Sequence, residues 1–218
     1  MAKLSGMTAV ERPKTLSRIA YLRIQQAIRD GDISHGNLYS ENELAEKLGM
    51  SRTPVREAVI ALVREGLVEV ASQRGFRLRQ LSPAQRAEVF DLRTLLESYV
   101  AQRLATEATD DDVRRLREII DRQEQLADPA QASAFLAVDE EFHLLMPRLL
   151  GLDRTHDTLV TLRGTMWLIG FEALALPRRI PAVIAEHRAI VDAIAAHDPE
   201  AAARAARAHI ENTAAAAR

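Results

Sequence analysis

Four side chains in the C-terminal half of the chain have the types and the spacing of a metal site. Asp139 and His143 lie four residues apart, so on a helix both point the same way. A carboxylate and an imidazole at this spacing can bind one metal ion together, although such pairs also arise by chance. His187 and His209 lie on the apolar faces of two later predicted helices. A lone core histidine is more often hydrogen-bonded to a carbonyl or carboxylate, so the residues alone leave both interpretations open.

Arg93 is a candidate for holding a small anion beside such a metal. It falls on the inward side of a predicted helix, with Val89, Leu96 and Val100. Alternatively, it forms an ion pair with Glu97 one helical turn later, which stabilises a helix by only about 0.3–0.5 kcal/mol when exposed. The pattern of residues supports both interpretations equally.

A second set of candidates lies in the N-terminal half, at the start of a predicted helix. Arg52 and Arg56 lie four residues apart on the side that faces away from the apolar stripe, and Thr53 is beside them. A helix that enters the major groove uses its N-terminal residues: arginine can bind guanine through two hydrogen bonds, and threonine can contact a thymine methyl or a phosphate. The alternative is a solvated face of an ordinary helix.

The elements around this helix favour the DNA-binding interpretation. Ser40 and Glu43 predict a capping box that opens a preceding short helix, and Gly49 ends it. Pro54 fits the first turn of the next helix, where its missing N–H costs nothing. Two helices joined by so tight a turn predict a helix-turn-helix.

A small β-hairpin is predicted directly after this pair of helices. Residues 67–71 and 76–78 alternate between apolar and polar, and the sequence Gln73-Arg74-Gly75 between them is typical of a turn. Such a hairpin is the wing of a winged helix-turn-helix. Arg74 at its basic tip is a further candidate for contacting DNA.

The run LAEKLGMSRTPVREAVIALVREGLVEV, followed by Gly75, closely resembles the winged helix-turn-helix of the GntR family of bacterial transcriptional regulators. The resemblance implies that Arg52, Thr53 and Arg56 contact operator DNA, and that Gly75 lets the backbone approach the minor groove. Asn42 stands where many members carry another DNA-contacting arginine, and an asparagine there could still donate to a phosphate or a base.

The rest of the chain is predicted to be helical. N-caps and prolines predict helix starts at Ser82-Pro83, Thr109, Asp128-Pro129, Asp153, Pro181 and Asp198-Pro199. Six helices with short connections predict an antiparallel bundle. The predicted fold class is therefore mainly α, with a winged helix-turn-helix followed by an all-α bundle.

This bundle resembles the FCD domain of the FadR-type branch of the family. Its metal-binding members carry the D-x-x-x-H, E-H-x-x-I and later histidine pattern that Asp139, His143, His187 and His209 reproduce here. The resemblance implies one metal per chain and a role for Arg93 in holding carboxylate effectors. Three imidazoles and a carboxylate suit zinc, nickel, iron or manganese better than magnesium or calcium.

Length and charge agree with two domains. The 218 residues are divided in the prediction into a flexible tail over 1–14, a DNA-binding domain over 15–80 and an effector domain over 81–218. Residues 1–80 hold 13 Lys and Arg against 9 Asp and Glu, a charge of +4, whereas the remainder holds 16 against 22, a charge of −6. A basic head on an acidic body is expected of a DNA-binding protein with a separate sensing domain.

Amino-acid composition limits the kinds of metal site and the cellular location expected for the chain. The chain has no cysteine, which excludes disulfides and thiolate metal sites, and it shows no apolar run as long as a membrane span. We therefore expect a cytoplasmic protein without a membrane partner.

These features predict a transcriptional regulator, most simply a repressor, that binds a palindromic operator as a homodimer and responds to a small carboxylate metabolite. Three alternatives are an acyl-CoA-responsive regulator, a metal-free effector pocket and a metal-dependent hydrolase. The hydrolase would need a general base, and the sequence offers no candidate beside the predicted ligands.

Overall fold

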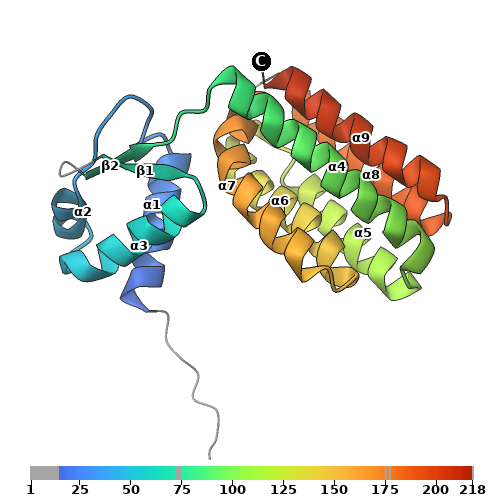
Figure 1. Cartoon of the computed structure of the whole chain (residues 1–218), viewed down its shortest axis with the longest axis horizontal. Helices are drawn as coiled ribbons and strands as arrows, with labels where there is room; N and C mark the ends of the chain where they lie inside the picture. The colour runs from blue at the N-terminus through green and yellow to red at the C-terminus, as the bar shows by residue number, and fades with distance from the viewer. Residues whose placement is uncertain (1–14, 72–74, 175, 177, 218) are drawn as a thin grey trace, which may run out of the picture. The chain divides into compact units, whose positions relative to one another are not determined.

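The computed structural model describes residues 15–217, except residues 72–74, 175 and 177 (Figure 1). The side chains of residues 29, 129, 133, 163–168 and 170–173 are also not described. The predicted tail over residues 1–14 and the candidate Arg74 therefore lie outside the described residues. The chain forms two compact units, one up to Val63 together with Val68–Leu78, the other Arg64–Leu67 together with the residues from Arg79 onward.

The first unit is a winged helix-turn-helix, as predicted. It contains α1 (Leu16–Arg29), α2 (Glu41–Lys47) and α3 (Arg52–Arg64), followed by β1 (Val68–Ala71) and β2 (Gly75–Leu78). The strands pair antiparallel, with Val70 opposite Phe76. Its core is formed by fully buried apolar side chains of α1, α3 and the wing, among them Ala20, Ile24, Val55, Val59, Leu62 and Phe76.

The predicted capping box at the start of α2 is wrong in detail. Ser40 Oγ accepts a hydrogen bond from the backbone N–H of Asn42, at 3.2 Å, rather than from that of Glu43. Ser40 still caps the helix, because either N–H belongs to the first turn and lacks a partner within the helix.

Gly75 is required by the packing of the wing itself. The backbone of Tyr39 pairs with Phe76 through two hydrogen bonds, so that the chain before α2 lies against β2. Gly75 has φ +122°, and a Cβ placed there would lie 2.0 Å from the carbonyl oxygen of Tyr39. No side chain fits this position without moving one backbone segment away from the other.

Replacing Gly75 with alanine is therefore expected to destabilise the full-length protein by about 2 to 3 kcal/mol, from a strained φ together with the backbone clash. Chemical unfolding of the full chain measures this. Gly36→Ala is a matched control, because Gly36 also has a positive φ, but a Cβ added there would meet no other atom within 4 Å. Equal losses for the two variants would show that the contact with Tyr39 does not matter.

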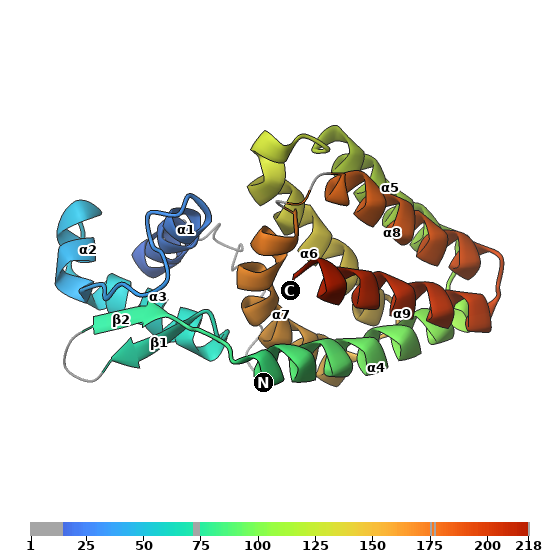
Figure 2. The same ribbon diagram turned by 90° about the horizontal axis from the view of Figure 1, so that it is seen from above.

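The second unit is an all-α antiparallel bundle (Figures 1 and 2). Its helices are α4 (Pro83–Glu107), α5 (Asp110–Gln125), α6 (Ala132–Leu149), α7 (Asp153–Leu174), α8 (Arg179–Ala195) and α9 (Pro199–Ala216). Both views show α4 running alongside α9, and Arg86 near the start of α4 donates to the carbonyl of Ala217 at 3.2 Å. Among the described residues, no helix combines the length and apolar character needed to cross a membrane.

Two predicted helix starts differ from the structure. The third bundle helix begins with a short 3-10 turn, η1 (Pro129–Gln131), before α6 starts at Ala132. The fifth, α8, begins at Arg179, so Pro181 is its third residue. A proline is tolerated there because the first-turn N–H groups have no partner within the helix.

Candidate metal centre and DNA-contacting surface

Three histidines from three helices meet inside the bundle. His143 on α6, His187 on α8 and His209 on α9 are all buried, and the nitrogens they offer lie within 4.8 Å of one another. The Nε2 atoms of His187 and His209 are 3.4 Å apart. Two nitrogens that bind one ion at about 2.1 Å are separated by roughly 3 to 3.5 Å, so this spacing suits a shared metal.

The predicted carboxylate lies beside the histidines. Asp139 Oδ2 is 3.8 Å from His143 Nε2, and its Oδ1 is 3.7 Å from His187 Nε2. Its side chain is 16% exposed, whereas the histidines are at most 3% exposed. The structure therefore brings together all four predicted ligands, with the carboxylate on the more accessible side.

The other nitrogen of each imidazole, Nδ1, contacts a polar residue outside the cluster. Glu97 Oε2 is 2.5 Å from Nδ1 of His143, and Glu186 Oε2 is 2.7 Å from Nδ1 of His209. For His187 the partner is the amide oxygen of Gln123, at 2.9 Å. Outer hydrogen bonds of this kind hold the rings of metal-binding histidines and leave Nε2 facing the ion.

Electrostatics favour the metal-binding state of these groups. Burial, together with the neighbouring His209 and His143, holds the pKa of His187 well below its ordinary value, so its imidazole is neutral at pH 7. A neutral imidazole is the form that binds a metal. With neutral nitrogens, a carboxylate and no cysteine, the donor set fits a divalent transition metal.

The two outer carboxylates are kept ionised by arginines. Burial opposes ionisation of Glu97, but Arg93 and His143 outweigh it and hold the Glu97 pKa well below its ordinary value. Burial also opposes ionisation of Glu186, yet hydrogen bonds from His209 and Arg179 lower its pKa to about 2. Both carboxylates are therefore strong acceptors for the imidazole N–H groups at neutral pH.

Arg93 forms the ion pair with Glu97 that the sequence offered as one alternative. The Nε atom of Arg93 is 2.6 Å from Glu97 Oε1, and the two side chains are only 3% and 2% exposed. This burial differs from the exposed pair considered above, and it places Arg93 behind His143, with Glu97 between them.

The DNA-contacting candidates lie on the surface of the first unit. Arg52, Thr53 and Arg56 are exposed at the N-terminal end of α3, and Asn42 is exposed in the first turn of α2. Arg52 Nε is 3.1 Å from Glu41 Oε2, which connects the starts of the two helices. The side chains thus lie outside the core and are available to a groove.

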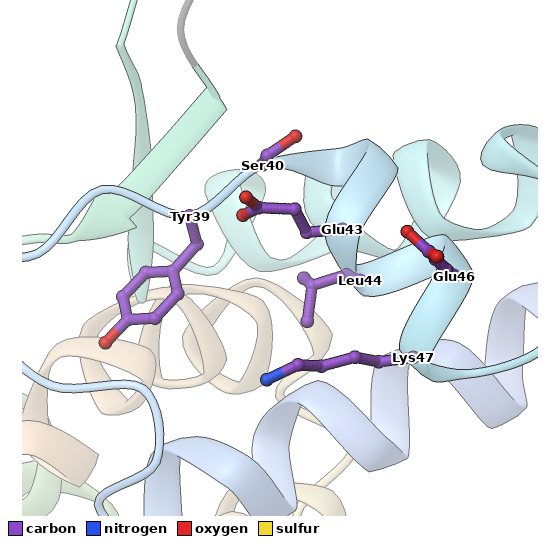
Figure 3. Close-up of a pocket in the computed structure, with 6 residues that line it drawn as sticks. All are labelled: Tyr39, Ser40, Glu43, Leu44, Glu46 and Lys47. Carbon is purple, nitrogen blue, oxygen red and sulfur yellow. The ribbon is translucent and has the colours of Figure 1, made fainter.

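A pocket of about 500 Å³ also lies beside α2 (Figure 3). It is lined by Tyr39, Ser40, Glu43, Leu44, Glu46 and Lys47. None of these residues belongs to the candidate metal centre or to the candidates for DNA contact.

Two family models match the chain. The model of the gntR family of bacterial regulatory proteins matches residues 16–78, and the FCD domain model matches residues 88–212. The chain belongs to the GntR family of bacterial transcriptional regulators. It carries the family's helix-turn-helix together with an FCD domain, and it is a DNA-binding regulator rather than an enzyme.

Relatives across the whole chain agree with this. A regulator in an unstable DNA locus of Streptomyces ambofaciens is 34% identical, over 90% of this chain and 83% of its own length. The repressor NanR of Cronobacter sakazakii is 31% identical over 95% of this chain and 88% of its own length. The repressor RspR of Escherichia coli is 28% identical over 82% of this chain and 78% of its own length.

Solved structures share the fold. McbR/YncC of Escherichia coli has a TM-score of 0.76 at 21% identity and covers 90% of this chain and 94% of its own. A GntR regulator from Rhodococcus sp. RHA1 has a TM-score of 0.77 at 24% identity, and the match covers 92% of this chain and 95% of that structure's chain. At these identities the likeness establishes the winged helix-turn-helix and helical bundle, and no more.

Sequence reasoning missed the outer partners of the histidines in this GntR regulator. The sequence indicates Glu97 only as an ion-pair partner of Arg93, and Glu186 only as part of the motif around His187. Glu186 points from α8 toward α9, where it accepts hydrogen bonds from His209 and Asn212. It also accepts a hydrogen bond from Arg179 on its own helix. Gln123 carried no signal, because a single glutamine on a charged helix is unremarkable in composition.

Proposed function

We propose that this GntR regulator represses transcription by binding a palindromic operator as a homodimer, and that a small carboxylate metabolite bound beside a divalent transition metal sets its operator affinity. The DNA-binding domain would comprise residues 15–80 and the effector domain residues 81–218. The observation that carries the proposal is the convergence of nitrogens from three buried histidines next to Asp139.

The metal would be held by His143, His187, His209 and Asp139, and could be zinc, nickel, iron or manganese. Four protein ligands leave coordination positions for an anion. Glu97, Gln123 and Glu186 would hold the three imidazole rings from outside the cluster. The surrounding core would exclude water from the buried side of the cluster.

A carboxylate effector is supported by Arg93. Its Nε atom donates to Glu97, and its side chain is a buried cation on α4. Such a guanidinium suits one oxygen pair of a carboxylate. Binding would change operator affinity only if the effector prefers one arrangement of the two domains over the other. Operator affinity that stays constant across a broad set of carboxylates would contradict this half of the proposal.

At the operator, Arg52, Thr53 and Arg56 would enter the major groove, with Asn42 nearby. Arg74 and Gly75 of the wing would approach the adjacent minor groove. Repression is the activity named for the relatives NanR and RspR, and we extend it to this chain by analogy.

The metal is tested by its removal. We expect about one transition metal per purified wild-type chain by mass spectrometry, and none in a His143→Ala, His187→Ala double variant, because two of four ligands are lost. His35→Ala is the control, since His35 lies exposed in the first unit. Wild-type protein that holds no metal even after incubation with zinc or nickel would contradict the proposed centre.

A homodimer is supported by an apolar stripe on α4. Leu92, Leu95 and Tyr99 are 39%, 65% and 46% exposed, and they recur at helical spacing on the side of α4 away from the core. A two-fold axis crossing this stripe would pack it against its own copy.

Leu95→Glu is expected to convert the dimer to a monomer at micromolar concentration, because it places a charge at the centre of the apolar stripe. Sedimentation measures the change. Leu176→Glu is the matched control, since Leu176 is 47% exposed but lies outside α4. A Leu95→Glu protein that remains dimeric would contradict the assignment of this face.

A further inference from the structure

The amide of Gln123 differs from the other two outer partners of the histidine cluster. It is fully buried, and its Oε1 atom lies 2.9 Å from Nδ1 of His187. We propose that Gln123 is a positioning residue for the metal centre, whose amide oxygen selects the tautomer of His187 that directs the Nε2 lone pair toward His143 and His209. This inference rests on the metal centre proposed above.

The two kinds of outer partner constrain an imidazole differently. An ionised carboxylate only accepts hydrogen bonds, so Glu97 and Glu186 can pair only with a protonated Nδ1. An amide can present its oxygen or its NH2 group, and the two orientations require opposite tautomers of the ring. With the NH2 group toward Nδ1, the hydrogen of a neutral His187 would sit on Nε2 and block metal binding there.

The surroundings of the Gln123 amide show that its orientation lowers the stability of the fold. With Oε1 on His187, the Nε2 atom of Gln123 is buried and has no hydrogen-bond acceptor among the described residues. A buried donor without an acceptor destabilises the folded protein. The presence of an amide with an unpaired NH2 group at this position is therefore not explained by the stability of the metal-free fold.

The position of His187 makes this orientation important. Its Nε2 is 3.4 Å from Nε2 of His209 and 3.7 Å from Oδ1 of Asp139, so it lies between two of the other proposed ligands. Its ring also stacks on Phe142 with 4.1 Å between the centroids, which limits the tilt of the imidazole. Phe142 restrains the plane of the ring, and Gln123 decides which nitrogen carries the hydrogen.

The test compares two variants of Gln123 in the full chain. Gln123→Met keeps the length of the side chain but removes both the acceptor and the unpaired donor, and Gln123→Glu keeps only acceptor atoms. We expect Gln123→Met to bind Zn²⁺ about 10- to 100-fold more weakly than wild type in chelator competition. Gln123→Glu should bind Zn²⁺ at least as tightly as wild type. Gln125→Met, exposed on the same helix, should change nothing.

A second measurement separates positioning from packing. In the metal-free state, Gln123→Met should melt at about the wild-type temperature or above. It removes the buried amide donor that has no acceptor, and the hydrogen that His187 donates to Gln123 can move to Nε2, which faces the carboxylate of Asp139 at 3.7 Å. A lower melting temperature of metal-free Gln123→Met, or Zn²⁺ affinity equal to that of wild type, would overturn the inference. So would Gln123→Glu binding as weakly as Gln123→Met.

The inference and the proposed function fail in different ways. Wild-type protein that binds no Zn²⁺ overturns both. Wild-type protein that binds Zn²⁺, with an unchanged affinity in Gln123→Met, leaves the metal centre in place and removes only the role of Gln123.

Discussion

An Arg52→Ala, Arg56→Ala double variant is expected to bind the operator at least about 30-fold more weakly than wild type. Each arginine that pairs with a guanine is worth about 1 to 3 kcal/mol, so losing two costs at least about 2 kcal/mol for each recognition helix. Both side chains are exposed at the N-terminal end of α3, where a helix in the major groove meets the bases.

The measurement uses an operator selected by the wild-type protein from a random-sequence pool, at one fixed salt concentration because phosphate contacts are salt-dependent. Arg64→Ala is the matched control, since Arg64 is exposed at the opposite end of α3. The fold should survive, because the ion pair of Arg52 with Glu41 is largely exposed on the arginine side and such pairs contribute little. A double variant that binds within twofold of wild type would contradict the assignment of this surface.

An Arg93→Met variant is expected to lower the free energy of unfolding by about 3 to 5 kcal/mol. The variant leaves the carboxylate of Glu97 buried without its cation, and breaking one side of a buried pair is far more costly than losing an exposed one. Adding Glu97→Gln should recover most of the loss, because the amide oxygen still accepts from His143 while the uncompensated charge is gone.

Urea unfolding of metal-free protein, followed by circular dichroism, measures both effects. Arg103→Met is the control, because Arg103 pairs with Glu107 on the same helix at the same spacing but with side chains 32% and 44% exposed. It should cost far less stability than Arg93→Met, because exposed ion pairs contribute little. Equal losses for Arg93→Met and Arg103→Met would show that Glu97 is not held as a buried charge.

The contribution of Glu97 to stability depends on pH in a defined direction. Its pKa is lowered by folding, so the pair contributes stability that is fully present above the ordinary glutamate pKa and is lost as the pH falls through the lowered value. The difference in the free energy of unfolding between wild type and Arg93→Met should therefore shrink in acid, because protonation of Glu97 removes the benefit of the pair in one and the uncompensated charge in the other. Acid and the Arg93→Met substitution therefore test the same ion pair between Arg93 and Glu97, the first by protonating the carboxylate and the second by removing the cation.

Much of the fold followed from local signals in the sequence. Ser82 and Thr109 form capping boxes with Gln85 and Asp112, and α4 and α5 begin where these residues predicted. The helical period placed Val55, Val59 and Leu62 on the buried face of α3. These predictions succeeded because caps and periodicity depend on residues within one or two turns of each other.

The start of α8 shows where local signals end. Pro181 predicted the first turn, but the helix begins at Arg179, whose guanidinium donates to both oxygens of Glu186 and to Thr213 on α9. These contacts stabilise the additional residues of the first turn, and one of the partners lies 34 positions away in the chain. No pattern within the segment reports them.

By itself, the sequence determined the winged helix-turn-helix and the order of the bundle helices, because these depend on residue type and spacing within single elements. The four candidate metal ligands lie on three helices, and it was the resemblance to the FCD domain that grouped them. Only the tertiary structure decided that Arg93 and Glu97 are buried together behind His143, and that Gln123 supports His187 from 64 residues away. The physical reason is that periodicity shows which face of a helix is buried, but not which side chains of other helices that face meets.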